Sequence, residues 1–176
     1  MQKEPSSLIC EGELKSSQIV VFALIMGIAS FLFVCLVLFF INRSNIQPPN
    51  VDPHNFLTIA FVFALISFTG YLSAMYVPEI IIKKQREKFI GKSVEEINSS
   101  DVVQMHRNHL IVKLALLESS ALAGLILFLL TILNDLIYAE EEYWLALIPA
   151  LFFFYNAFVL FPTREKISDF VKINFS

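Results

Sequence analysis

Glu118 is the residue whose type and position most strongly suggest chemistry. It lies within an apolar stretch, residues 110–133, eight positions after Leu110, which is about 12 Å along a helix. A charged carboxylate at that depth in a membrane costs about 3 kcal/mol or more, so the neutral form is favoured. Such a carboxyl can take up and release a proton or bind a cation, H⁺ or Na⁺ here. Alternatively, it can join helices by hydrogen bonds while protonated.

A deep carboxyl needs polar partners at a similar depth in neighbouring helices. Lys113 lies five positions before Glu118 on a different helix face, and its amine is expected to reach the membrane interface. We therefore predict a polar layer in which Glu118 bonds an amide or a tyrosine hydroxyl. The candidate partners in the neighbouring apolar stretches are Thr69, Tyr71, Tyr155 and Asn156.

Other chemistry-bearing residues form no complete site. His106 and His109 have a spacing that can place them on one helix face, but no third ligand for zinc is evident, so no metal is expected. Cys10 and Cys35 are expected to be ordinary thiols. The sequence contains no G-x-S-x-G, H-E-x-x-H, C-x-x-C or P-loop motif, so we expect no enzyme. A second alternative is a lipid-acting enzyme that uses the two histidines and Glu118.

The composition identifies the surroundings that must position these residues. Of 176 residues, 56% are apolar and 16% are charged, and 18 are phenylalanine. Ordinary soluble domains carry about 25% charged residues. The net charge of −3 lacks the basic excess that nucleic-acid binding needs. The chain is therefore predicted to be an integral membrane protein with no nucleic-acid partner.

Four segments are long and apolar enough to cross a hydrocarbon layer about 30 Å thick. Backbone polar groups in lipid must pair within their own segment, so each is predicted to be a helix. The four spans are residues 19–41, 56–77, 110–133 and 143–161. They divide the chain into a leader at 1–18, a long middle loop at 79–109 and a tail at 162–176.

Charge placement predicts the orientation. Basic residues concentrate in the middle loop and the tail, whereas segment 134–142 holds four acids and no lysine or arginine. The positive-inside rule then places both termini and the middle loop in the cytoplasm, in a bacterial inner membrane. Residues 79–92 are expected to form an amphipathic helix or, alternatively, a solvated loop. Ser93 and Glu96 have the spacing of a capping box.

An internal similarity suggests a duplicated hairpin. Residues 23–26 (Ala-Leu-Ile-Met) align with residues 115–118 (Ala-Leu-Leu-Glu), and spans two and four both end in a proline followed by basic residues. The predicted fold is an all-α membrane four-helix bundle of two parallel-repeated hairpins. Small residues at four-residue spacing let helices approach closely in lipid, so spans one and three are the expected close-packed pair. The packing residues are Ala23, Gly27, Ala115, Ser119, Ala123 and Gly124.

The third span also resembles a known family. Glu118, Ala121 and Gly124 match the carboxylate, Ala and Gly of the ion-binding helix in rotary ATPase c-subunits, the proteolipids. With Met26 in place of a second carboxylate, the chain looks like vacuolar-type proteolipids. The resemblance implies that Glu118 binds H⁺ or Na⁺. It covers about a dozen residues, and the acid is in the third helix rather than the fourth. The overall layout is more similar to small four-span bacterial membrane proteins.

Together these observations favour a non-enzymatic polytopic membrane protein. It is expected to contact membrane lipids and to self-assemble or to serve as an accessory subunit of a larger membrane complex. The alternative is a proteolipid-like subunit that handles protons or cations through Glu118. No cofactor is expected beyond such an ion.

Overall fold

The structure is a computed structural model that describes residues 11–45, 47–48, 51–87 and 99–175. Every regular element in these ranges is helical, which confirms the predicted all-α class. The α-helices are α1 (Glu11–Asn42), α2 (Pro53–Glu87), α3 (Ser99–Leu133), α4 (Ile148–Val159) and α5 (Arg164–Phe175). Short 3₁₀ helices are η2 (Arg43–Asn45), η3 (Leu136–Tyr138) and η4 (Glu141–Leu147).

Four of the described segments are long and apolar enough to cross a membrane, as the sequence predicted. The fourth combines two kinds of helix, because η4 leads directly into α4. Pro149 lies in the first turn of α4, where its missing N–H group loses no helical bond. Its ring would crowd the carbonyl of Leu145 in a continuous α-helix, so regular α-helix begins only at this proline.

The helices extend beyond the expected spans. α2 continues past residue 77 through Pro78 to Glu87, and α3 begins at Ser99 rather than at residue 110. Residues 79–87, which were expected to form an amphipathic helix or a solvated loop, are therefore helical as a continuation of α2, and α3 begins within the expected middle loop. The expected capping box at Ser93 and Glu96 lies outside the described residues, as does the end of the expected amphipathic segment.

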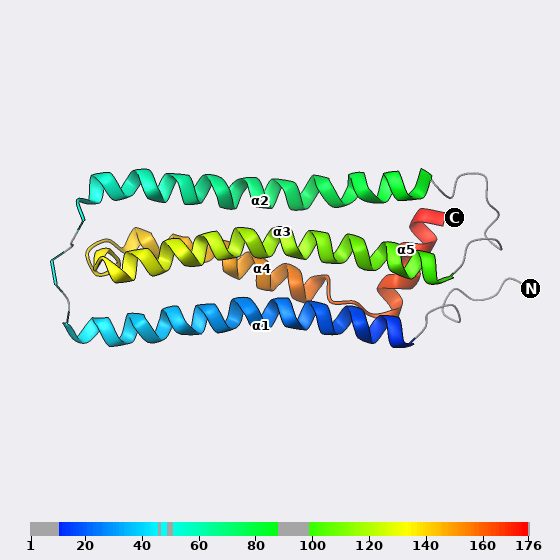
Figure 1. The fold of residues 1–176 in the computed structure, drawn as a ribbon, viewed down its shortest axis with the longest axis horizontal. Coiled ribbons are helices and arrows are strands. Elements are labelled where there is room, and N and C mark those ends of the chain that lie inside the picture. The colour runs from blue at the N-terminus through cyan, green and yellow to red at the C-terminus, as the bar shows by residue number, and fades with distance from the viewer. Residues whose placement is uncertain (1–10, 46, 49–50, 88–98, 176) are drawn as a thin grey trace, which may run out of the picture.

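α3 is the central helix of the bundle. In Figure 1, α1 and α2 lie on opposite sides of α3, and α4 lies behind it. Within the 18-residue apolar window of α3, 56% is buried inside the bundle. The corresponding share is 11% for α1, 11% for α2 and 17% for the fourth span. Two equivalent hairpins are therefore not confirmed, because the consecutive helices α1 and α2 are separated by α3 while α3 and α4 pack together.

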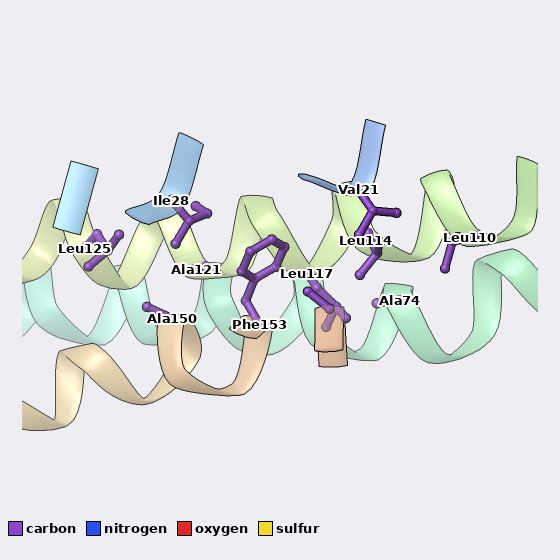
Figure 2. Packing of buried hydrophobic residues seen from close by; sticks show 11 residues of the cluster. Val21, Ile28, Ala74, Leu110, Leu114, Leu117, Ala121, Leu125, Ala150 and Phe153 are labelled. Atoms are coloured by element: carbon purple, nitrogen blue, oxygen red, sulfur yellow. The ribbon is translucent and has the colours of Figure 1, made fainter. Parts of the chain in front are cut away.

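The core lies where α1, α3 and α4 meet. Figure 2 shows Phe153 of α4 pointing toward α3 between Leu117 and Ala121. Ile28 of α1 packs into the same cluster and is fully buried. These closely packed apolar contacts stabilise the bundle through van der Waals attraction.

The two ends of the bundle differ in charge. The start of α1, the end of α2, the start of α3 and all of α5 lie at one end (Figure 1). The described basic residues of that end include Lys83, Lys84, Arg164 and Lys166. The connection from α1 to α2 and the segment after α3 lie at the opposite end, where Asp135 and residues 140–142 carry the acids.

Side-chain bonds to the main chain hold α5 against the bundle. Lys166 Nζ donates hydrogen bonds to the carbonyls of Val159 (2.6 Å) and Phe161 (3.0 Å), which complete the C-terminal end of α4. Gln18 Nε2 of α1 donates to the carbonyl of Pro162 at 3.1 Å. The turn between α4 and α5 is thereby tied to the first helix.

Candidate functional site

Glu118 lies at the contact between α3 and α1. Its side chain is half-buried, and its Oε1 atom lies 3.6 Å from the position that a Cβ atom would occupy on Gly27. Gly27 itself is exposed. The carboxyl forms no hydrogen bond or ion pair with another residue that the structure describes. A deep acid therefore sits at the edge of the monomer beside a small residue of α1.

The structure does not bring the four candidate partners to Glu118. Thr69 Oγ1 donates to the carbonyl of Leu65 (2.9 Å) within α2, and Asn156 Nδ2 donates to the carbonyl of Phe152 (2.9 Å) within α4. Tyr71 packs edge-on against the Phe152 ring, with centroids 4.9 Å apart. Tyr155 is 65% exposed.

Helix geometry explains why the expected polar layer is not formed. Ser120 faces α2. Glu118 lies two positions earlier in α3, which corresponds to about 200° of rotation around the helix axis, so Glu118 points almost directly away from α2. The depth of Glu118 along its span is readable from the sequence, but the face of α3 that meets each neighbour is not. Matching residues by depth alone therefore leaves the direction of the Glu118 side chain undetermined.

The tightest contact between α2 and α3 uses two serines that the sequence analysis did not select as a pair. Ser67 Oγ donates to the carbonyl of Ser120 at 3.1 Å, and Ser120 Oγ donates to the carbonyl of Ser67 at 2.6 Å. A Cβ on Gly70 would lie 3.2 Å from Ser120 Cβ, so the absence of a side chain at Gly70 allows this approach. The four-residue spacing of Gly70 and Ala74 was the available signal.

The small residues predicted for helix packing have different surroundings. Ala123 and Gly124 are buried, and a Cβ on Gly124 would lie 2.5 Å from the carbonyl oxygen of Ala146 in η4. Gly124 therefore allows η4 to cross close to α3. Ala123 and Gly124 serve the contacts of α3 with its neighbours rather than a contact with α1.

The remaining small residues lie at the surface. Ala23 and Gly27 of α1 and Ala115 and Ser119 of α3 are all exposed. α1 packs on α3 instead through the larger buried side chains Val21, Ile28 and Cys35. The small faces of α1 and α3 are therefore not pressed against each other. Gly27 lies beside Glu118, and Ser119 Oγ lies 3.4 Å from the position that a Cβ would occupy on Gly70 of α2.

The two histidines contact an aromatic ring rather than a ligand cluster. The ring of Phe170 in α5 lies 4.9 Å from the ring of His106 and 6.3 Å from that of His109, between centroids. Within the described ranges, no group of three or more His, Cys, Asp or Glu side chains is arranged to hold a metal ion. This pair connects α3 to α5.

Aromatic side chains gather at the acidic end of the bundle. The rings of Tyr138 and Trp144 lie 5.3 Å and 5.1 Å from the ring of Phe39 in α1, between centroids. The Tyr138 hydroxyl donates to the carbonyl of Phe39 at 2.7 Å. Burial and the charge of Asp135 raise the pKa of Tyr138 above its ordinary value. The segment after α3 is thus fixed to the end of α1.

Comparison with known proteins adds no identity. No protein-family model, no curated protein and no solved structure matches the chain. Function must therefore be argued from the geometry of these helices.

Proposed function

We propose that this protein is a non-enzymatic polytopic protein of the bacterial inner membrane. Through helix packing it assembles with further copies of itself or serves as an accessory subunit of a larger membrane complex. Both termini are assigned to the cytoplasm, because the basic residues gather at the end that contains α5 and the start of α1. The acidic end then faces the outside of the cell.

The observation that carries the proposal is the exposed surface beside Glu118. This assembly face is defined by Glu118 and four exposed small residues, Ala23, Gly27, Ala115 and Ser119, and the small side chains let another helix approach closely. An acid in lipid without a hydrogen-bond partner is costly, and a donor from a second chain would remove that cost. A monomer surrounded only by lipid has no comparable means of satisfying the carboxyl.

Bulky substitutions on the assembly face test this proposal. Gly27→Leu and Ser119→Leu should shift the purified protein in mild detergent toward smaller assemblies, measured by size-exclusion chromatography with light scattering. Thr58→Leu is the matched control, because Thr58 is exposed at the start of α2 and outside the assembly face. If both assembly-face variants keep the size and stability of the parent protein, the packing role is wrong.

A second candidate function is proton or cation handling through Glu118, in the manner of the proteolipid-like helix. It is favoured by a half-buried carboxyl deep in a span with no hydrogen bond to any described residue. A hydrophobic carbodiimide should then label Glu118, with protection by Na⁺ or by raised pH, and Glu118→Gln should abolish the labelling. Absence of labelling in the parent protein at every pH would rule out an accessible ion site.

A further inference from the structure

A cleft of about 550 Å³ lies between α2 and the segment formed by η4 and α4. Its floor is made by small residues, because Ala60 and Ala64 of α2, Gly124 of α3 and Ala146 of η4 leave space where larger side chains would fill it. None of its lining residues belongs to the assembly face, so the two surfaces do not overlap.

The walls of the cleft are apolar and reach the molecular surface. Phe61 and Phe68 of α2 are 69% and 57% exposed, and Leu145 of η4 is 64% exposed. The Ser67 hydroxyl on its lining is already engaged, since it donates to the carbonyl of Ser120. An apolar space of this kind gives water few hydrogen-bond partners, so it favours an apolar occupant.

The dimensions of the cleft decide what kind of apolar occupant fits. Its α2 wall runs from Leu57 to Tyr71, which is about 21 Å of helix rise. One leaflet of hydrocarbon is about 15 Å deep, so the cleft spans the leaflet next to the acidic end. The cleft is therefore long enough for one extended acyl chain to lie along α2 from the acidic end toward the middle of the membrane, and docking of a second copy is an outcome of the test below.

The polar end of the cleft carries negative charge. Glu142 lines it, and Tyr143 packs edge-on against Phe56 near the start of α2, with ring centroids 5.5 Å apart. Glu140 and Glu141 precede Glu142, and segment 134–142 contains no lysine or arginine. Complementary charge favours a cationic amine at this position and disfavours an additional anion.

The geometry points to a lipid-binding site in this cleft. The occupant is one acyl chain of a phospholipid with an amine headgroup, the chain lying along α2 and the amine facing the Glu142 carboxylate. The inference rests on the membrane placement given under the proposed function, but not on the assembly face.

Native mass spectrometry of the full-length protein, released from nanodiscs containing equal parts phosphatidylethanolamine and phosphatidylglycerol, tests the site. The parent protein should retain one phosphatidylethanolamine in preference to phosphatidylglycerol. Ala64→Phe fills the cleft and should lose the bound lipid. Glu142→Gln should keep a lipid but reduce the preference for the amine headgroup about fivefold, the effect of one charge near a membrane surface.

The matched control separates this site from assembly. Ala115→Phe adds the same ring on the assembly face, so it should change oligomer size and leave lipid retention intact. Equal retention of lipid by Ala64→Phe, or equal retention of both headgroups by the parent protein, would overturn the lipid site. A change of oligomer size in Ala64→Phe alone would also overturn it, by showing that the cleft receives a second copy.

Discussion

Gly124 is the residue at which α3 and η4 come closest. A methyl group there would lie 2.5 Å from the carbonyl oxygen of Ala146, a main-chain atom that cannot rotate away. Gly124→Ala gains up to about 1 kcal/mol in helix propensity, but overpacking costs about 1–3 kcal/mol. We expect a net loss of stability, measured as a lower thermal midpoint in detergent.

The same substitution at Gly12 is the control for Gly124→Ala. A Cβ on Gly12 would meet nothing within 4 Å, so Gly12→Ala should be neutral or slightly stabilising. Equal midpoints for the two variants would show that η4 does not cross α3 as closely as described.

Tyr138 provides the residue-scale link between the acidic end and α1. Tyr138→Phe removes the 2.7 Å hydrogen bond to the carbonyl of Phe39 and keeps the ring stacking, so we expect a loss of about 1 kcal/mol in the free energy of unfolding. The pKa of Tyr138 is raised above the ordinary value of 10.0. The contribution of the protonated hydroxyl is therefore complete below pH 10 and disappears as the pH rises through the raised pKa.

The control for Tyr138→Phe is Tyr76→Phe, since Tyr76 is 65% exposed on α2. The difference in unfolding free energy between the parent protein and Tyr138→Phe should shrink at strongly alkaline pH. A difference that stays constant with pH would contradict the assignment of the bond to the phenol hydroxyl.

At the residue scale, the sequence gives the type of residue 118 and its position along α3, but not the direction in which its side chain points. Glu118 stands out in the sequence because it is the only acidic residue in the third apolar stretch, residues 110–133. Its orientation toward Gly27 depends on how α3 is rotated against three neighbours, and a nearly uniform apolar helix encodes that rotation weakly. The roles of Ser67 and Gly70 could not be predicted for the same reason, since each residue contributes through its contact with Ser120 on another helix.

At the scale of elements, the two serines between α2 and α3 give a quantitative expectation. Each hydroxyl donates to the main-chain carbonyl of the other residue, and alanine keeps that carbonyl. Ser67→Ala and Ser120→Ala should each cost about 0.6 kcal/mol, typical of such bonds in membranes. Because neither bond needs the other hydroxyl, the double variant should cost close to the sum.

Steric trapping or denaturation in mixed micelles measures these serine variants. Thr69→Ala is the control, because the Thr69 hydroxyl bonds only carbonyls of its own helix, those of Leu65 and Ile66. Strong non-additivity in the Ser67 and Ser120 double variant would mean that the two helices shift when either bond is lost.

The existence of the elements was largely predictable, and their limits were not. Long apolar stretches identified all four candidate spans. The extension of α2 to Glu87 passes through Pro78 and several charged residues, which hydropathy alone assigns to a loop. The 3₁₀ form of η4 arises from Pro149 together with the close approach at Gly124, and only the second of these needs the folded structure.

At the scale of the whole molecule, the charge difference between the two ends predicts topology. In a background with Cys10→Ser and Cys35→Ala, Gln47→Cys should react with a membrane-impermeant maleimide added to intact cells. Glu165→Cys should react only after lysis, because α5 lies at the basic end. Lys84→Cys is a second reporter of the basic end, and the opposite labelling pattern would invert the proposed orientation.

The arrangement of helices was the part of the fold that the sequence did not reveal. Similar stretches in spans one and three suggested two equivalent hairpins, yet the described residues place α3 between α1 and α2. Apolar side chains of similar size can pack in several ways in lipid, and the choice depends on small local details such as Ser67, Gly70 and Gly124.

The central position of α3 has a consequence for biogenesis. α1 and α2 are synthesised first, but the helix that holds each of them comes later in the chain. At about 5–20 residues per second, a ribosome needs several seconds to complete α3 after α2 has emerged. In the membrane topology proposed above, the newborn protein then has only its first two helices in place, and the bundle forms when α3 packs between them.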